Sequence, residues 1–316
     1  MREIGGYIEL DSYHLPMLHE NAIALNCGRN CLAYLFKSRN IKKLKIPYFI
    51  CNSIFDVCDR ECVEKSYYHI GMDFKPTKDF TIEENEWLYL VNYYGQLSNR
   101  EIQRFVKKYH RVIVDQANGY YEKPLPNVDT FYTCRKWFGV ADGAFLYTDK
   151  KIKNEYPQDE SYERMRFLLG RYERTASEFY NEYNANNKLF KTENIKRMSK
   201  LTWNLLHGID YKVVKQQRLE NFNYIHEHLG HKNLLELKPA AFMYPFMVKN
   251  GAILRKRLQI EKIYIPTLWP IVFDIAKQGT VEYKMAENIL PLPIDQRYRI
   301  EDMEYMCSKI VELLKI

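Results

Sequence analysis

The stretch Phe131-Tyr-Thr-Cys-Arg-Lys-Trp-Phe-Gly-Val-Ala-Asp-Gly-Ala-Phe-Leu146 sets a lysine, Lys136, among apolar and aromatic residues. About twenty residues upstream, the apolar run Arg111-Val-Ile-Val-Asp115 ends in an isolated carboxylate. Such a run is typical of a buried parallel strand, and ligands in open α/β sheets gather at the carboxyl ends of the strands. We therefore expect Asp115 at a ligand-binding edge. Taken alone, it is equally consistent with an acid that caps the following turn.

Lys136 and Asp115 together suggest pyridoxal phosphate (PLP) chemistry. A lysine amine can hold the aldehyde of this cofactor as a Schiff base. A buried aspartate paired with the pyridine nitrogen keeps that nitrogen protonated, so that the ring can accept electrons. We therefore predict that Lys136 and Asp115 are the catalytic residues.

Short β-rich runs alternate with helical stretches between residues 20 and 150, which is typical of a three-layer α/β lobe. The β-rich runs are residues 45–50, 87–91, 111–115 and 144–147. Helical periodicity marks residues 99–109, between the middle pair of these runs. We expect long helices over residues 160–229. From about residue 233, short strands and a closing helix at residues 300–316 predict a smaller α/β lobe.

The composition is that of an ordinary folded chain: of 316 residues, 46% are hydrophobic and 28% are charged. The net charge of +7 is spread among acidic residues, which argues against nucleic-acid binding. The longest charge-free apolar stretch, residues 263–273, contains two prolines and is far shorter than the roughly 20 residues of a membrane span. The first residues do not resemble a signal peptide, so we expect a cytoplasmic protein that is not bound to a membrane.

Cysteine and histidine patterns do not predict a metal site. Two pairs among the seven cysteines have four-residue, helical spacing rather than the Cys-x-x-Cys spacing of zinc or redox sites, so we expect buried, reduced thiols. His226, His228 and His231 lie where a long helical stretch gives way to Gly230. No carboxylate or cysteine pattern completes a site there, so we interpret them as a polar helix end.

A candidate phosphate loop, Asn26-Cys-Gly-Arg-Asn-Cys-Leu32, lies between an apolar segment and a helical run. Gly28 allows close backbone approach, and the amides that follow it open a helix, which is how chains hold phosphate dianions. An ordinary helix start is the alternative for this segment alone. The phosphate interpretation gains support because the segment precedes Asp115 and Lys136 in the expected order.

With these motifs in place, the chain resembles, nearly end to end, the DegT/DnrJ/EryC1/StrS family of PLP-dependent sugar aminotransferases of fold type I. The segments that match family motifs, in the family's order, are residues 26–32, 46–49, 92–96, 114–118, 136, 142–144, 197–199, 287–294 and 299–305. The last two correspond to the terminal Leu-Pro motif and closing helix of the family.

The resemblance implies a role for each matched residue. It places Lys136 at the Schiff-base lysine and Asp115 at the pyridine nitrogen. Asn118 falls on the glutamine that supports the ring hydroxyl of the cofactor. The phosphate loop supplies Gly28, Arg29 and Asn30 as cofactor-binding residues.

Two further residues are expected to act across a dimer. Residues 197–199 reproduce the Arg-Met-Ser of the family motif, and Asn194 lies one position from the asparagine that reaches the cofactor phosphate of the neighbouring chain. The resemblance therefore implies a homodimer in which Asn194 and Arg197 complete the partner's site.

The chain departs from the family at several positions. The interval from Asp115 to Lys136 is shorter than usual, and Phe131 replaces the serine five places before the lysine, so Thr133 or Thr130 must supply that phosphate contact. Three aromatic residues compete for the position that stacks on the cofactor ring, namely Tyr48, Phe49 and Tyr93. The last of these is included among the predicted cofactor-binding residues.

The resemblance also implies the architecture. We expect an α/β protein with a three-layer large domain, residues 1–205, built on a mixed, mainly parallel sheet, and a smaller C-terminal α/β domain, residues 206–316. A helical insertion at about residues 155–192 is expected to reshape the substrate mouth or the dimer.

The implied activity is transfer of an amino group from an amino acid such as glutamate to a keto sugar, which family precedent places on a nucleotide. The product would serve surface polysaccharide or glycoconjugate biosynthesis. Two alternatives stay open. Relatives that dehydrate sugars carry histidine in place of the lysine, and Lys136 argues against them. The other alternative is a catalytically degenerate relative that acts as a binding protein.

Overall fold

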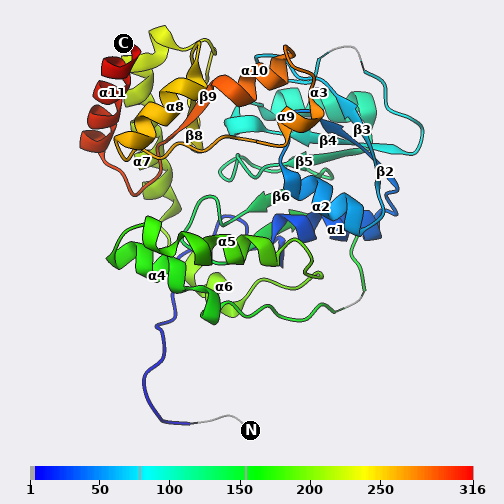
Figure 1. Ribbon diagram of the computed structural model, residues 1–316. Coiled ribbons are helices and arrows are strands. Elements are labelled where there is room, and N and C mark those ends of the chain that lie inside the picture. Colours follow the sequence, from blue (N-terminus) through cyan, green and yellow to red (C-terminus); the bar gives the residue numbers. More distant parts are fainter. Residues whose placement is uncertain (1–3, 78–79, 154, 316) are drawn as a thin grey trace.

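The computed structural model describes residues 4–77, 80–153 and 155–315. Its centre, within these residues, is a seven-stranded sheet in the order β1-β7-β6-β5-β4-β2-β3 (Figure 1). The strands are β1 (Ile23–Leu25), β2 (Lys43–Pro47), β3 (Glu64–Tyr68), β4 (Glu86–Val91), β5 (Val112–Asp115), β6 (Asp129–Thr133) and β7 (Ala144–Tyr147). Strands β3, β2, β4, β5 and β6 are parallel, whereas β7 is antiparallel to β6 and β1. The predicted mixed, mainly parallel sheet is confirmed.

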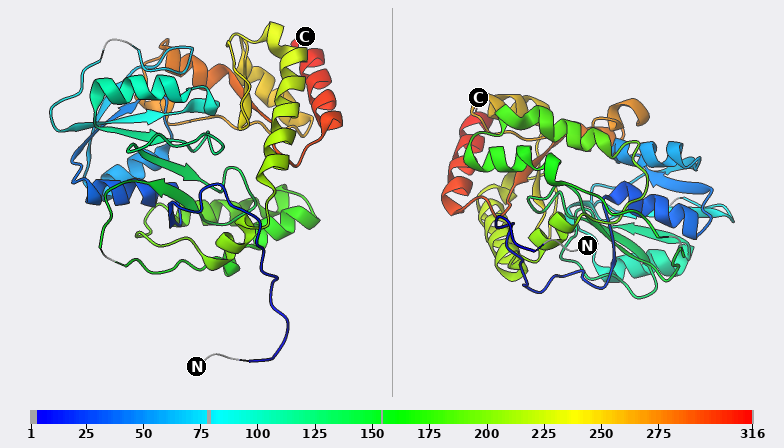
Figure 2. Two further views of the ribbon diagram at one scale, coloured as in Figure 1. Left: turned by 180° about the vertical axis from the view of Figure 1, so that it is seen from behind. Right: turned by 90° about the horizontal axis from the view of Figure 1, so that it is seen from below.

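Helices cover both faces of this sheet. The helices α1 (Gly28–Ser38) and α2 (Asn52–Arg60) lie on one face, and α3 (Asn99–Tyr109) lies on the other (Figure 2). A capping box begins α3, in which Ser98 and Glu101 satisfy each other's backbone amides. The three-layer arrangement predicted from the alternation of strands and helices is confirmed.

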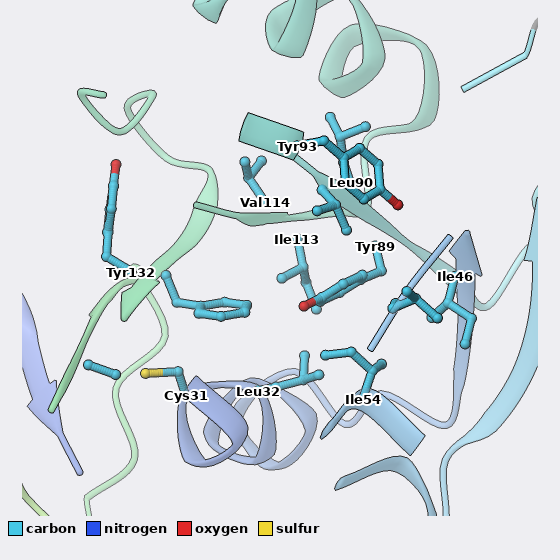
Figure 3. Close-up of a cluster of buried hydrophobic side chains, with 14 of the residues drawn as sticks. Cys31, Leu32, Ile46, Ile54, Tyr89, Leu90, Tyr93, Ile113, Val114 and Tyr132 are labelled. Carbon is cyan, nitrogen blue, oxygen red and sulfur yellow. The ribbon is translucent and has the colours of Figure 1, made fainter. Parts of the chain in front are cut away.

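The space between the sheet and α1 is filled by a continuous cluster of buried side chains. In Figure 3, Cys31 and Leu32 of α1 face Tyr89 of β4 and Ile113 of β5. All four residues of β5 are buried, as expected for a central parallel strand. Because β5 is packed on both faces, its last residue, Asp115, is held in a fixed position.

A second hydrophobic cluster surrounds a two-stranded antiparallel sheet of β8 (Met243–Met247) and β9 (Ile289–Pro293). The helices that pack here are α7 (Tyr211–Leu229), α8 (Gly251–Ile260) and α11 (Ile300–Leu314). Two short helices, α9 (Val272–Ile275) and α10 (Val281–Asn288), carry buried side chains of the first cluster. The two clusters therefore adjoin, and the domain boundary at residue 206 stays a prediction.

The expectation of long helices over residues 160–229 is only partly met. This region contains α4 (Arg166–Glu173), α5 (Tyr180–Leu189), α6 (Lys200–Leu206) and α7. Only α7, with 19 residues, is long. Arg174 ends α4 because its backbone leaves the helical region, with φ −137° and ψ −143°. Along the residues that the structure describes, every helix is too short or too polar to span a bilayer.

Candidate active site

A pocket of about 270 Å³, including the solvent at its mouth, lies where β4 and β5 end. Asp115 and Lys136, which the sequence analysis paired, both line it. The other lining residues are Phe49, Ile50, Cys51, Val91, Tyr93, Ala117, Asn118 and Trp269. The fold therefore brings the predicted lysine and aspartate into one cavity at the carboxyl edge of the sheet.

Asp115 is buried at the end of β5, and both of its carboxylate oxygens accept hydrogen bonds. The Tyr89 hydroxyl donates to Oδ2 at 2.6 Å, and the Ala117 amide donates to Oδ1 at 2.7 Å. Burial raises the pKa of Asp115, while the charge of Lys136 and these two donors oppose that rise. Asp115 thus holds the turn that follows β5 and also lines the pocket, so its role toward a ligand stays a prediction.

Lys136 lies in the turn that follows β6, and its side chain is exposed. Its Nζ atom lies 5.8 Å from the centre of the Phe242 ring. The indole of Trp137 donates to the Ala117 carbonyl at 3.0 Å. This bond ties the Lys136 turn to the loop that follows Asp115, so the two predicted catalytic residues are connected through one intervening contact.

The predicted phosphate loop forms the start of α1, with Gly28 as its first residue. A Cβ atom on Gly28 would lie 2.8 Å from Cγ2 of Thr133 and 3.3 Å from the Phe131 ring, so the end of β6 leaves room only for glycine. The first amides of an α-helix have no partner inside the helix and attract anions. Thr133 Oγ1 is buried without a hydrogen-bond partner among the described residues.

Side chains of the phosphate loop are engaged elsewhere. Arg29 pairs with Asp56 at 3.2 Å. Asn30 donates to Asn26 Oδ1 and to the carbonyl of Asn194, each at 2.8 Å. The Asn30 amide also donates to the Cys27 carbonyl at 3.1 Å, so the amides of Gly28 and Arg29 are the backbone groups of this loop that could serve an anion.

Thr130 and Thr133 were the two candidates to replace the missing serine, and they differ in the structure. The Thr130 hydroxyl donates to the Val128 carbonyl at 3.0 Å, within its own strand region. The Thr133 hydroxyl is buried, has no such partner among the described residues, and belongs to the residue that abuts Gly28. Of the two, Thr133 has the hydroxyl that a phosphate could use.

Asn194 and Arg197 both have exposed side chains. Arg197 Nε donates to the Tyr156 carbonyl at 3.2 Å. Their segment is anchored at its end, because the amide and hydroxyl of Ser199 each donate to the Asp142 carboxylate at 2.7 Å. Two segments that resemble family motifs, residues 142–144 and 197–199, therefore hold each other in place.

The aromatic candidates for stacking on the ring separate clearly. Tyr48 packs on Tyr67, with ring centres 4.9 Å apart, and is absent from the residues that line the pocket. Phe49 and Tyr93 both line it, and the Tyr93 hydroxyl donates to the Phe49 carbonyl. A fourth aromatic residue, Trp269, lines the pocket together with Phe49 and Tyr93.

The sequence analysis missed Trp269. Its ring meets Phe49 edge-on with centres 5.0 Å apart and lies 5.7 Å from the ring of Tyr93. It belongs to the apolar stretch 263–273, which was considered only as a membrane candidate. Because Trp269 reaches the pocket through packing between residues far apart in the chain, no local pattern marks it.

Among the cysteines and histidines that the structure describes, Cys51 alone lines the pocket. All seven cysteines are free thiols; most are buried, Cys51 is half-buried and Cys62 is exposed, contrary to the expectation of burial. His226 and His228 lie in the last turn of α7, the polar helix end that was predicted.

No family model and no curated protein matches the chain, but solved structures share its fold. NtdA from Bacillus subtilis, with bound cofactor PMP, has a TM-score of 0.67 and 16% identity over 93% of this chain and 73% of its own. A DegT DnrJ EryC1 StrS aminotransferase from Brucella abortus has a TM-score of 0.60 and 13% identity, covering 92% and 85%. The sugar aminotransferase CalS13 from Micromonospora echinospora has a TM-score of 0.60 and 12% identity, covering 92% and 86%. The chain therefore shares the fold of the DegT/DnrJ/EryC1/StrS aminotransferases, the family that its motifs resemble.

Proposed function

We propose that the protein is a PLP-dependent aminotransferase that moves an amino group from an amino acid, such as glutamate, to a keto sugar. The observation that carries this proposal is the convergence of Asp115 and Lys136 in one pocket at the carboxyl edge of the sheet. Similarity in fold to NtdA with its bound PMP and to the sugar aminotransferase CalS13 supports it.

The residues present offer partners to both ends of PLP, the ring end inside the pocket and the phosphate end at the start of α1, whose residues are not among those that line the pocket. At the phosphate end, the first amides of α1 and the unpartnered hydroxyl of Thr133 offer donors to a dianion. At the ring end, Asp115 offers a carboxylate to the pyridine nitrogen. Asn118 lines the pocket and has a buried amide oxygen without a partner among the described residues, so its amide group is available to the ring hydroxyl.

PLP, when bound, supplies an aldehyde that takes up the amino group and a ring that accepts electrons. Lys136 Nζ would hold that aldehyde and, once freed by the amino donor, would be the base that carries a proton between donor and cofactor. Asp115 would keep the pyridine nitrogen protonated. Burial disfavours the charge on Asp115, and a cationic ring nitrogen opposite it would offset that penalty.

The acceptor is proposed to be a nucleotide-linked keto sugar used for surface polysaccharide or glycoconjugate synthesis, on the resemblance of the motifs alone. The active unit is proposed to be a homodimer. Support for the dimer comes from the exposed side chains of Lys136, Asn194 and Arg197, which a second chain could cover.

Reduction with borohydride in the presence of PLP tests the proposal. The wild-type protein should develop a near-visible absorbance band with PLP, and reduction should leave one covalent adduct, mapped to Lys136 by mass spectrometry. Lys136→Ala should lose both signals. Lys215→Ala is the matched control, because Lys215 is also exposed and its Nζ also lies 5.8 Å from an aromatic ring, that of Tyr121.

Absence of any adduct on Lys136 would contradict the proposal. It would favour the alternative of a degenerate relative that acts as a binding protein, for which the specific observation is Phe131 in place of the phosphate-side serine. An adduct without amino transfer to any keto sugar would retain the cofactor site but remove the sugar as substrate.

A further inference from the structure

Arg218 of α7 is a charged residue in an unusual environment, because only 1% of its surface is exposed. A buried guanidinium must recover the hydration that it loses. Burial lowers the pKa of Arg218 to about 10, so the group is still charged at neutral pH. Burying such a charge costs free energy of folding, so the contacts that offset this cost show what the residue holds in place.

The hydrogen-bond partners of Arg218 are amide and carbonyl oxygens rather than carboxylates. Nε donates to Gln296 Oε1 at 2.8 Å. Nη1 donates to the carbonyls of Ala241 and Phe242 at 2.9 and 3.2 Å, and Nη2 donates to the carbonyl of Trp137 at 3.0 Å. Since every guanidinium nitrogen already has a protein acceptor, Arg218 is not placed to bind the carboxylate of a substrate.

These contacts converge on Lys136. Trp137 is the next residue in the chain, and its carbonyl also accepts a bond from Gln296 Nε2 at 2.9 Å. The Phe242 ring lies 5.8 Å from Lys136 Nζ. The guanidinium of Arg218 also stacks on the Trp137 ring, 4.7 Å from its centre. Arg218 therefore holds the Trp137 carbonyl, directly after Lys136, and the Phe242 carbonyl just before β8. The ring of Phe242 lies beside the Lys136 amine.

We propose that Arg218 is a positioning residue for Lys136, fixing the turn at Trp137 against Phe242 so that the amine stays in the pocket. This inference rests on the proposed function for the role of the lysine, but the contacts themselves do not. A lysine at position 218 could not reproduce the arrangement, because its three donors share one nitrogen, whereas the planar guanidinium reaches four acceptors from three separate nitrogens.

The test compares Arg218→Met and Arg218→Lys with Arg255→Met. Arg255 is the matched control, since it also donates to backbone carbonyls, those of Glu287 and Ile289, but contacts neither Trp137 nor Phe242. The first readout is hydrogen exchange of the Trp137 and Phe138 amides, which both donate to the Cys134 carbonyl and report on the turn. The second is the rate at which Lys136 captures PLP, trapped with borohydride and mapped by mass spectrometry.

We expect exchange at these two amides to rise about 10-fold or more in both Arg218 variants, because Arg218→Met loses the charged donor and Arg218→Lys cannot keep the bonds to Trp137, Ala241 and Phe242 together. Capture of PLP at Lys136 should slow by about 100-fold, the loss that misplacement of a reacting group by about 1 Å can cause. Arg255→Met should change neither readout, even where it lowers thermal stability equally.

Unchanged exchange at Trp137 and Phe138 in a folded Arg218→Met protein would overturn the proposal, as would equal effects in Arg255→Met. Failure of the wild-type protein to capture PLP would defeat the proposed function instead, and the exchange measurement would still decide whether Arg218 holds the turn. Should Arg218→Met not fold, Gln296→Leu removes one of the two donors to the Trp137 carbonyl and should give a smaller rise in exchange at the same amides; no rise would then overturn the proposal.

Discussion

The two ends of the candidate site differ in how firmly this chain holds the groups that would face a ligand. At the ring end, both oxygens of Asp115 have donors and the Lys136 turn is held by Arg218, Gln296 and Trp137, while the buried amide oxygen of Asn118 lacks a partner among the described residues. At the phosphate end, the Thr133 hydroxyl is buried without a partner among the described residues, next to the open start of α1.

This contrast indicates how strongly each end depends on a ligand for its geometry. A buried, unpaired hydroxyl costs free energy, so it persists where a bound group supplies the missing partner. The ring end is preorganised and should tolerate little change in geometry. The phosphate end should be the part of the site whose stability depends on the cofactor and, in our proposal, on a second chain.

The largest expected effect tests whether the phosphate end is completed by a partner chain. A Lys136→Ala chain and a chain carrying Asn194→Ala with Arg197→Ala should each be inactive alone. Mixing them should restore part of the wild-type activity, because one site of each heterodimer then has both sets of groups. The measurement is amino transfer by heterodimers isolated through two affinity tags.

A second possibility is that Asn194 and Arg197 act on the cofactor site of their own chain. Its carbonyl accepts a bond from Asn30 of the same chain, so the segment lies beside its own phosphate loop. If Asn194 and Arg197 act within their own chain, isolated heterodimers will show no turnover. That outcome would remove the shared site but leave the cofactor assignment intact.

The next effect concerns the ring end. Asp115→Asn should bind PLP but lower kcat by about 100-fold to 1,000-fold, the loss that follows removal of one buried electrostatic contact. Single-turnover absorbance measurements would show whether the loss lies in proton transfer. Near-normal single-turnover rates would mean that Asp115 serves only the turn that follows β5.

Much of this ring end could be predicted because its signals are local. Residues 99–109 form α3 and residues 144–147 form β7 as expected, and the apolar run before Asp115 forms β5. A capping box fixes where α3 begins, and burial on both faces gives β5 its continuous apolar pattern. Because Asp115 ends β5, the rule that ligands bind at the carboxyl ends of parallel strands was enough to predict its place in the pocket.

Other parts depended on contacts between distant residues. Strand β6, which leads to Lys136, begins with a buried Asp129 that is neutralised by Arg39 at 2.7 Å, and no local pattern announces that pair. Trp269 and Arg218 reach the site through packing of the C-terminal part on the large sheet. Their roles could be found only once the fold placed them beside Phe49 and Trp137.

A smaller effect separates the two threonines at the phosphate end. Thr133→Val should weaken PLP binding by about 10-fold, the size expected for one hydrogen bond to a charged group, without lowering the stability of the cofactor-free protein. Thr130→Val should do the reverse, because its hydroxyl already bonds to the Val128 carbonyl. Titration with PLP and thermal unfolding of both variants measure the two quantities. Equal loss of PLP affinity in both variants would place the phosphate elsewhere.

The smallest expected effect concerns the cofactor-free protein and the charge of Asp115. Burial raises the pKa of this group above its ordinary value, so the folded state binds its proton more tightly than the unfolded chain does. The stability that this proton contributes is present at low pH and is lost as the pH rises through the raised pKa.

At pH 7, Asp115→Asn should therefore be at least as stable as the wild-type protein without PLP, and its stability should fall less as the pH rises from acid to neutral. Saturating PLP should reverse the order, because the pyridine nitrogen gives the wild-type carboxylate a cationic partner. Urea unfolding at several pH values, with and without PLP, measures both comparisons. Suppose that Asp115→Asn is less stable than wild type at pH 7 without PLP. The hydrogen bonds from Tyr89 and Ala117 would then be enough to stabilise the ionised Asp115, and no cofactor would be needed to explain it.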